Sequence, residues 1–352
     1  MNANTIKLYL FLILTVLFIN WQYIKLNKAP LHWDGAAHIN LSLLYADKLQ
    51  NFSLKDALAL SNYYPPLLHF VGGVGYTILP RAETFNLLTY FFASFLLIFT
   101  GLFLWETLKN KVSIEACIFS VLVLTLLPQF YRELHFYRLD LPLMALIVGG
   151  LWSLKKSDYL KSNIYTTVFF VFLTLAQLTK WYAFIFFLAP IIETLFNWSK
   201  VYKTKLLVGL IISAAAVSWW YIPNFDQVYS FYSGGYAAGE MNDPRIIFSL
   251  ENLTEYLKLL VVYQTFFLNL LVLLAATLYI FSSNKKTLFW AFVSILIPYM
   301  VFTLIINKDV RYVMPLIIYM LIPLALSYDK LSDNLKTKKA IVTLLFITNF
   351  LL

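Results

Sequence analysis

Five charged residues stand at the ends of apolar runs, where charged side chains are costly unless they have a partner or a function. They are Asp34, Arg138, Asp140, Lys180 and Arg311. A carboxylate in a cleft can remove a proton from a hydroxyl, and arginine and lysine side chains bind phosphate and stabilise charge on a leaving group. These residue types indicate a site for group transfer from an anionic substrate.

The first acid lies in APLHWDGAAHIN, residues 29–40. Asp34 begins a predicted helix, so its plain interpretation is an N-cap whose carboxylate accepts a backbone N–H. The functional interpretation is a general base flanked by Trp33, with His38 one turn further along the same face. The two interpretations are compatible.

A second group of charges lies in FYRELHFYRLDLPL, residues 130–143. Asp140 falls just inside a predicted membrane span, where a carboxylate normally faces the protein interior and has a partner. A structural ion pair of Asp140 with Arg138 or Arg132 is the alternative to a catalytic role.

Three further segments carry candidate substrate contacts. Lys180 in QLTKWY either extends to lipid headgroups or binds phosphate. In NKDVRYVMP, Arg311 and the adjacent Tyr312 indicate either a surface salt bridge or a phosphate contact. The tyrosine- and glycine-rich segment 229–245, with Tyr232, is predicted to be a mobile loop that stacks on a sugar-like substrate, or a disordered loop without function.

The composition predicts an all-α integral membrane protein. Of 352 residues, 61% are hydrophobic and 13% charged, against about 25% charged residues in soluble domains. About eleven apolar runs could form bilayer-spanning helices. They are Ile6–Ile24, Thr84–Trp105, Ile114–Leu127, Leu139–Leu154, Ile164–Leu178, Trp181–Phe196, Leu206–Ile222, Leu259–Ser282, Leu288–Ile306, Val313–Ser327 and Ala340–Leu352.

The distribution of charge predicts the orientation of these spans. With a cytoplasmic N-terminus and a retained first span, the cytoplasmic segments carry the whole net charge of +9, as the positive-inside rule requires. The basic balance therefore reports topology and not a nucleic-acid partner. The same threading puts all five charged residues on the extracytoplasmic side, which favours one shared site there.

The outer segments differ in length from the short cytoplasmic links. Residues 25–83 form a long first outer loop, in which Gly35–Gln50 has the pattern of an amphipathic surface helix and Pro66–Leu79 is predicted to be interfacial or re-entrant. Residues 223–258 form a second long outer loop. We expect residues 1–352 to form one polytopic membrane domain, with Lys180 at an outer hairpin.

Motifs for several other chemistries are absent from the sequence. There is one cysteine, no His-Glu-x-x-His, no Gly-x-Ser-x-Gly and no Gly-Lys-Ser/Thr loop. The sequence identifies no cofactor, and it leaves a divalent metal open.

Five short motifs, in order, resemble those of the GT-C membrane glycosyltransferases, particularly the protein O-mannosyltransferase and lipid A aminoarabinose transferase branch. No single motif is specific, but the ordered set covers most of the chain. The motifs are Trp33-Asp34-Gly35, Tyr64-Pro65-Pro66-Leu67, Arg138-Leu139-Asp140, Leu178-Thr179-Lys180 and Arg311-Tyr312-Val313-Met314-Pro315.

Three positions depart from that family pattern. Gly35 stands where a second acid often follows, Tyr64 where a lysine often precedes Pro-Pro, and Trp181 where a glycine often follows Leu-Thr-Lys. We also expect a chain without the soluble C-terminal domain of many members.

The resemblance implies transfer of a sugar from a polyprenyl-phosphate-linked donor to a lipid, glycan or protein acceptor, at the outer face of a bacterial cell membrane. It implies that Asp34 is the base and that Arg138, Lys180, Arg311 and Tyr312 bind the donor phosphate. Asp140 would position an arginine or the acceptor, and the expected substrate contacts are Trp33, His38, Tyr64 and Tyr232. A lipid or sugar transporter or flippase is the main alternative, and a non-catalytic assembly subunit is the third.

Overall fold

The structure is a computed structural model that describes residues 3–26, 33–60, 63–197, 201–239, 243–244, 246–259 and 284–331. Within these residues all regular structure is helical, which confirms the predicted fold class. The helices are α1 (Ala3–Leu26), α2 (Trp33–Gln50), α3 (Leu54–Leu58), α4 (Leu67–Ile78), α5 (Glu83–Thr107), α6 (Ile114–Thr125), α7 (Pro128–Glu133), α8 (Asp140–Lys156), α9 (Asn163–Gln177), α10 (Ile185–Leu195), α11 (Lys203–Ala238), α12 (Leu250–Leu259), α14 (Lys285–Thr303), α15 (Val310–Val313) and α16 (Leu316–Leu331).

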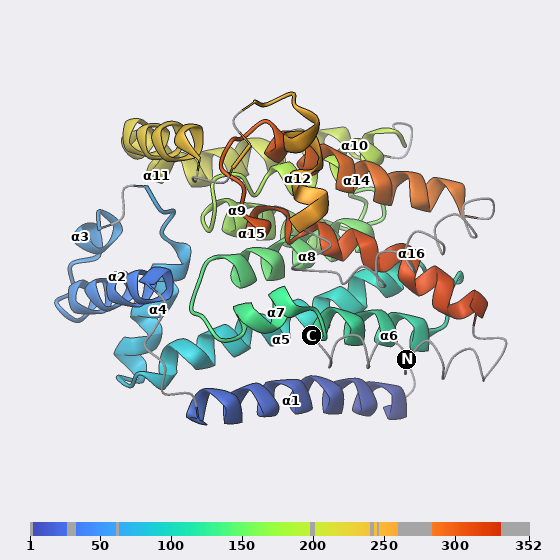
Figure 1. Ribbon diagram of the computed structural model, residues 1–352, viewed down its shortest axis with the longest axis horizontal. Coiled ribbons are helices and arrows are strands. Elements are labelled where there is room, and N and C mark those ends of the chain that lie inside the picture. Colours follow the sequence, from blue (N-terminus) through green and yellow to red (C-terminus); the bar gives the residue numbers. More distant parts are fainter. Residues whose placement is uncertain are drawn as a thin grey trace.

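Helix α8 is the central element of the bundle (Figure 1). Its sequence is apolar on all sides between Leu141 and Leu154, and nearly all of these residues are buried, as expected of a helix surrounded by others. It packs against α5 and α9. Asp140 and Lys155 lie at its two ends, about 22 Å apart along the axis at 1.5 Å per residue.

Four described helices are long and apolar enough to cross a membrane. They are α1, α5, α11 and α14, and several shorter apolar helices lie in other predicted spans. A 12-residue helix is about 18 Å long, shorter than the roughly 30 Å hydrocarbon core, so such segments need flanking residues to complete a crossing. The chain is therefore an integral membrane protein by composition and fold, and the number of eleven crossings stays a prediction.

The first outer segment folds into helices, as predicted for 35–50. Helix α2 packs along α4 at one end of the bundle, on the left in Figure 1. Glycine at the contact permits this approach, because a Cβ on Gly73 would lie only 2.7 Å from the Cβ of Tyr45. The polar residues Asp34, His38 and Ser42 form the buried face of α2. The location of α2 on the membrane surface stays a prediction.

One predicted boundary is wrong. The segment that starts the second outer loop, from residue 223, continues the helix of the preceding span, because α11 runs unbroken from Lys203 to Ala238 and contains Pro223. The fall in hydropathy there does not mark the end of the helix. The predicted spans Leu259–Ser282, beyond its first residue, and Ala340–Leu352 lie outside the described residues.

Candidate active site

Asp34 meets two arginines from distant parts of the chain. Its Oδ2 lies 2.6 Å from Nη1 of Arg311 and 3.6 Å from Nε of Arg138. Asp34 lies in the first turn of α2, Arg138 just before α8, and Arg311 in α15. Burial raises the pKa of Asp34, but attraction to His38, Arg311 and Arg138 outweighs it and leaves the pKa below its usual value. The carboxyl is therefore ionised in this arrangement.

A second ion pair joins Asp140 and Lys180 beside the first. Lys180 lies in the turn between α9 and α10, and its Nζ is 2.6 Å from Oδ1 of Asp140 and 3.0 Å from the hydroxyl of Tyr182. The Asp140 side chain is 3% exposed and the Lys180 side chain 11% exposed. Taking two charges out of water is costly, and removing either partner of such a pair typically costs about 3–5 kcal/mol. We therefore expect each partner of this pair to hold the other in the folded protein.

Arg311 connects the two carboxylates. Its Nη1 contacts Asp34 and lies 3.9 Å from Oδ2 of Asp140, while Nε and Nη2 reach Asp309 at 2.7 and 2.5 Å. Burial lowers the pKa of Arg311, and the charges of Asp140, Asp309 and Asp34 raise it by more, so the guanidinium stays charged. Arg311 therefore forms the predicted salt bridge, with Asp309, and also an inward ion pair with Asp34.

Glu133 extends the cluster behind Arg138. Its Oε1 accepts a hydrogen bond of 2.8 Å from Gln129 Nε2 and lies 3.7 Å from Nη1 of Arg138. Burial and the nearby Asp140 charge raise the pKa of Glu133 to about 8, although Arg138 acts in the opposite direction. With a proton on Glu133, the carboxylates of Asp34, Asp140 and Asp309 balance the charges of Arg138, Lys180 and Arg311.

The Glu133→Gln variant is expected to become more stable than the wild type as pH rises. Between its ordinary pKa of 4.5 and the folded value of about 8, folded Glu133 keeps a proton that the unfolded chain releases. Stability of the wild type therefore falls as pH rises through this window, and glutamine removes that dependence. Thermal unfolding of both proteins in detergent at pH 6, 7, 8 and 9 measures this difference in stability.

The difference in melting temperature between Glu133→Gln and wild type should increase from pH 6 to 8 and then stay constant. About 1 kcal/mol corresponds to about 2–4 °C in a protein of 150–250 residues. Glu251→Gln on the exposed face of α12 is the matched control and should follow the wild type. A constant difference across the range would show that Glu133 is ionised in the folded protein.

Two histidines continue from Asp34 into the interior. His38 Nε2 lies 3.5 Å from Asp34 Oδ1, and His38 Nδ1 lies 2.8 Å from Nε2 of His69. Burial lowers the pKa of His38 to about 4 and that of His69 well below its usual value, so both rings are neutral at pH 7. A carboxylate only accepts, so His38 carries its proton on Nε2 and accepts from the Nε2–H of His69.

Aromatic side chains border the charged cluster. The Tyr64 ring lies 5.0 Å from that of His38, and Phe231 of α11 lies 4.4 Å from Tyr63. Tyr232 contacts Trp181 at 5.1 Å between ring centroids. These rings form a wall that suits the apolar faces of a sugar or an isoprenoid.

The remaining predicted contacts have different positions. Trp33 is 75% exposed at the start of α2. Tyr312 is buried, its hydroxyl donates to Asn307 Oδ1 at 3.0 Å, and its ring lies 5.9 Å from Lys180 Nζ. Among the described residues, no group of three or more His, Cys, Asp or Glu is arranged to hold a metal ion.

Several interpretations made from sequence are corrected. Asp34 lies in the first turn of α2, whose described part begins at Trp33. Lys180 does not extend to headgroups, because its Nζ turns inward to Asp140. The closest ion pair of Asp140 is therefore with Lys180, and not with Arg138 or Arg132 as predicted. The segment from Tyr229 to Ala238 is helical and not a mobile loop.

Sequence reasoning gave no role to four residues that the site contains: Glu133, His69, Tyr182 and Asp309. Glu133 and Asp309 were visible as charges near the arginines, but only tertiary contact assigns their partners. His69 lies in an apolar segment, and a polar residue alone in such a segment was the available signal.

The described helices have the fold of a membrane protein of known structure. The chain is similar in structure to ArnT, a lipid A aminoarabinose transferase, from Cupriavidus metallidurans. The ArnT structure bound to undecaprenyl phosphate has a TM-score of 0.68 at 16% identity, and the apo structure 0.67 at 17%. Each match covers 97% of this chain and 63% of the ArnT chain. No family model and no curated protein sequence matches this chain.

Proposed function

We propose that this protein transfers a sugar from a polyprenyl-phosphate-linked donor to a hydroxyl of a lipid, glycan or protein acceptor at the extracytoplasmic membrane face. The observation that carries the proposal is the convergence of Arg311 and Arg138 on Asp34, next to the Asp140–Lys180 pair, within a fold shared with an undecaprenyl-phosphate-bound ArnT. A base and phosphate-binding cations are the two requirements of this reaction.

The cations receive the phosphate of the donor. Without a substrate, carboxylates accept hydrogen bonds from Arg311 and Lys180. The phosphodiester of an entering donor has oxygens that compete for the same N–H groups. When the sugar leaves, the phosphate gains negative charge. Cations already in place stabilise that charge more in the transition state than in the bound donor, which lowers the barrier.

Asp34 removes the proton from the acceptor. The acceptor oxygen forms a bond to the anomeric carbon as its proton moves to Asp34, and the bond from that carbon to the phosphate oxygen breaks with its electron pair. The polyprenyl phosphate departs and the anomeric configuration inverts. The paired Asp34 is a weak base, but phosphate binding to Arg311 weakens that pairing and raises the pKa of Asp34 towards a useful value.

His38 and His69 position this base in the proposed reaction. His38 presents its Nε2–H to Oδ1 of Asp34, and the bond from His69 fixes the His38 tautomer. One oxygen of Asp34 is thereby engaged, and the other faces the arginines.

Replacing His69 by leucine is expected to lower kcat about tenfold with little change in KM, because His38 can then adopt the wrong tautomer. His69 has a buried Nδ1 without a hydrogen-bond partner among the described residues, so its removal relieves an unsatisfied polar atom. The His69→Gln variant, which can still donate to His38, should keep most activity. Equal loss in both variants with equal loss of thermal stability would indicate a purely structural role.

The test of the proposed function is a transfer assay with purified protein in detergent. Radiolabelled polyprenyl-phosphate-linked hexoses and pentoses are mixed with membrane lipid, glycan or peptide acceptors, and product is separated by chromatography. The expected result is labelled acceptor plus free polyprenyl phosphate. Movement of labelled lipid-linked sugar across proteoliposome membranes without any transfer would instead identify a transporter or flippase.

A further inference from the structure

A polar cavity lies at the opposite end of the bundle from the carboxylate and arginine cluster. It has a volume of about 230 Å³ and is lined by residues from α5, α8, α10, α14 and α16. Its lining includes Lys155 at the C-terminal end of α8, whereas Asp140 stands at the N-terminal end. This cavity is therefore separate from the candidate active site.

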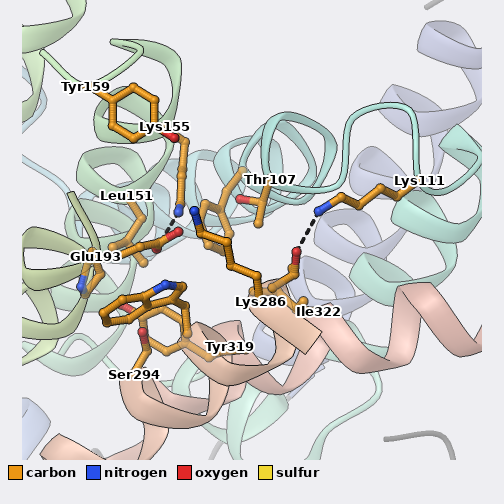
Figure 2. Close-up of a pocket in the computed structure, with 15 residues that line it drawn as sticks. Thr107, Lys111, Leu151, Lys155, Tyr159, Glu193, Lys286, Ser294, Tyr319 and Ile322 are labelled. Carbon is orange, nitrogen blue, oxygen red and sulfur yellow. Dashed lines mark hydrogen bonds and ion pairs between the residues drawn. The ribbon is translucent and has the colours of Figure 1, made fainter. Parts of the chain in front are cut away.

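Three lysines and one glutamate contribute charge to this cavity. Figure 2 shows Lys155 and Lys286 reaching the same space beside Glu193, with Lys111 at the other side and Thr107 between. Lys155 pairs with Glu193 at 2.5 Å. Lys111 donates to the neutral hydroxyl of Thr287 at 2.6 Å, and Lys286 has no ion pair within the described chain. Two positive charges are therefore left without a carboxylate.

The lysines repel one another across the cavity. Burial lowers the pKa of Lys111, and the charges of Lys155 and Lys286 lower it further, against the opposite effect of Glu193. A cavity with this excess of positive charge disfavours a metal cation. An anion between the lysines would relieve the repulsion.

An unsatisfied hydroxyl faces the same space. Oγ1 of Thr107 is buried, and the described part of the chain gives it no hydrogen-bond partner. A buried polar atom without a partner costs free energy, and a bound polar group in this cavity would remove that cost. Apolar and aromatic side chains complete the lining, including Phe103, Leu151 and Trp290. Such a cavity suits an anionic headgroup with an apolar stem.

At the rim, the backbone after α8 adopts an unusual conformation. Asp158, Tyr159 and Leu160 have φ values of 48°, 57° and 64°, in the left-handed region that non-glycine residues rarely occupy. Each such residue costs about 1–2 kcal/mol. This turn holds Tyr159 at the cavity, and strain of this kind often occurs at binding sites.

We propose that this cavity binds an anionic phosphate group between Lys111, Lys286 and Thr107, carried by a lipid headgroup of net negative charge or by a free phosphate. Both ammonium groups donate to phosphate oxygens, as does the threonine hydroxyl. The site connects α5 and α8 to α14 and α16, so occupancy stabilises the packing of these helices against one another. This proposal is independent of the proposed transfer reaction.

The experiment uses the full chain, delipidated in detergent, with three probes: phosphatidylglycerol, phosphatidylcholine and inorganic phosphate. Retained lipid is measured by native mass spectrometry, and thermal unfolding is measured with each probe. The Lys111→Gln/Lys286→Gln variant removes both ammonium groups. Lys285→Gln is the matched control, because Lys285 is exposed next to Lys286 and does not line the cavity.

Phosphatidylglycerol retention should fall at least fivefold in the double variant and be unchanged in Lys285→Gln. Stabilisation by inorganic phosphate as well as by phosphatidylglycerol identifies a site for free phosphate, and stabilisation by the lipid alone identifies a headgroup site. The proposal is overturned if neither phosphatidylglycerol nor inorganic phosphate stabilises the protein. It is also overturned if phosphatidylcholine is retained as well as phosphatidylglycerol, or if Lys285→Gln loses as much phosphatidylglycerol as the double variant.

A measurement on the wild type covers the case in which the double variant does not fold. Lysine acylation followed by peptide mass spectrometry gives the labelling rates of Lys111, Lys286 and Lys285 with and without the stabilising probe. Slower labelling of Lys111 and Lys286, with unchanged labelling of Lys285, supports the site. Unchanged labelling of all three excludes it.

Discussion

The Asp34→Asn variant is expected to retain its fold and lose sugar transfer by about 10²–10⁴-fold in kcat, the range that general-base catalysis contributes. Asparagine has the shape of aspartate but cannot accept the acceptor proton. The change also releases Arg311 and Arg138 from a competing carboxylate, so KM for the lipid-linked donor should stay constant or fall. A loss confined to kcat separates the base from a donor-binding residue.

Asp47→Asn on the same helix is the matched control, because Asp47 is exposed and its ion pair is with the neighbouring Lys48. Both variants are compared with wild type by size-exclusion chromatography, thermal unfolding and transfer assay at saturating donor. Near-normal turnover of Asp34→Asn would reject Asp34 as the base. Loss of folding in Asp34→Asn but not in Asp47→Asn would instead assign Asp34 a structural role.

The shared location of the charged residues was predictable from sequence, but their pairing was not. Threading by lysines put Asp34, Asp140 and Arg311 on one side, and the structure brings them together. Pairing depends on the turn between α9 and α10, which directs Lys180 inward to Asp140. Sequence distance cannot reveal such a contact, since the two residues are far apart along the chain and only packing sets their separation.

The helices were predictable where apolar runs were long, and less so where polarity changed within one helix. α8 matches the predicted span Leu139–Leu154 within a few residues. α11 extends beyond the predicted span Leu206–Ile222, because the polar residues after Ile222 lower the hydropathy without ending the helix. His69 lies in the segment Pro66–Leu79, which was interpreted as interfacial or re-entrant because counting it as a span would invert every later loop. In the structure this segment is α4, whose glycines permit close packing on α2 and bring His69 to His38.

The combined Lys180→Ala/Arg311→Ala variant is expected to show the second large effect. It removes the two cations that contact Asp140, and each well-placed donor to a developing charge contributes about 10²–10³-fold to kcat. Both donor affinity and kcat should fall, in contrast to Asp34→Asn. Donor affinity is measured by titration with the polyprenyl-phosphate-linked sugar in the absence of acceptor, and turnover by the transfer assay. Lys258→Ala on α12, whose ammonium group pairs with Glu255 at the surface, is the control.

A structural role of Lys180 is separated from donor binding by removing its partner as well. Lys180→Met alone leaves Asp140 buried without its nearest cation and should lower stability by about 3–5 kcal/mol. Adding Asp140→Asn removes the unpaired charge, so much of the stability should return. Transfer should stay low in the double variant, because the cation that stabilises the phosphate leaving group is still missing. Recovery of transfer together with stability would show that Lys180 only neutralises Asp140, and the donor phosphate would then depend on Arg311 and Arg138.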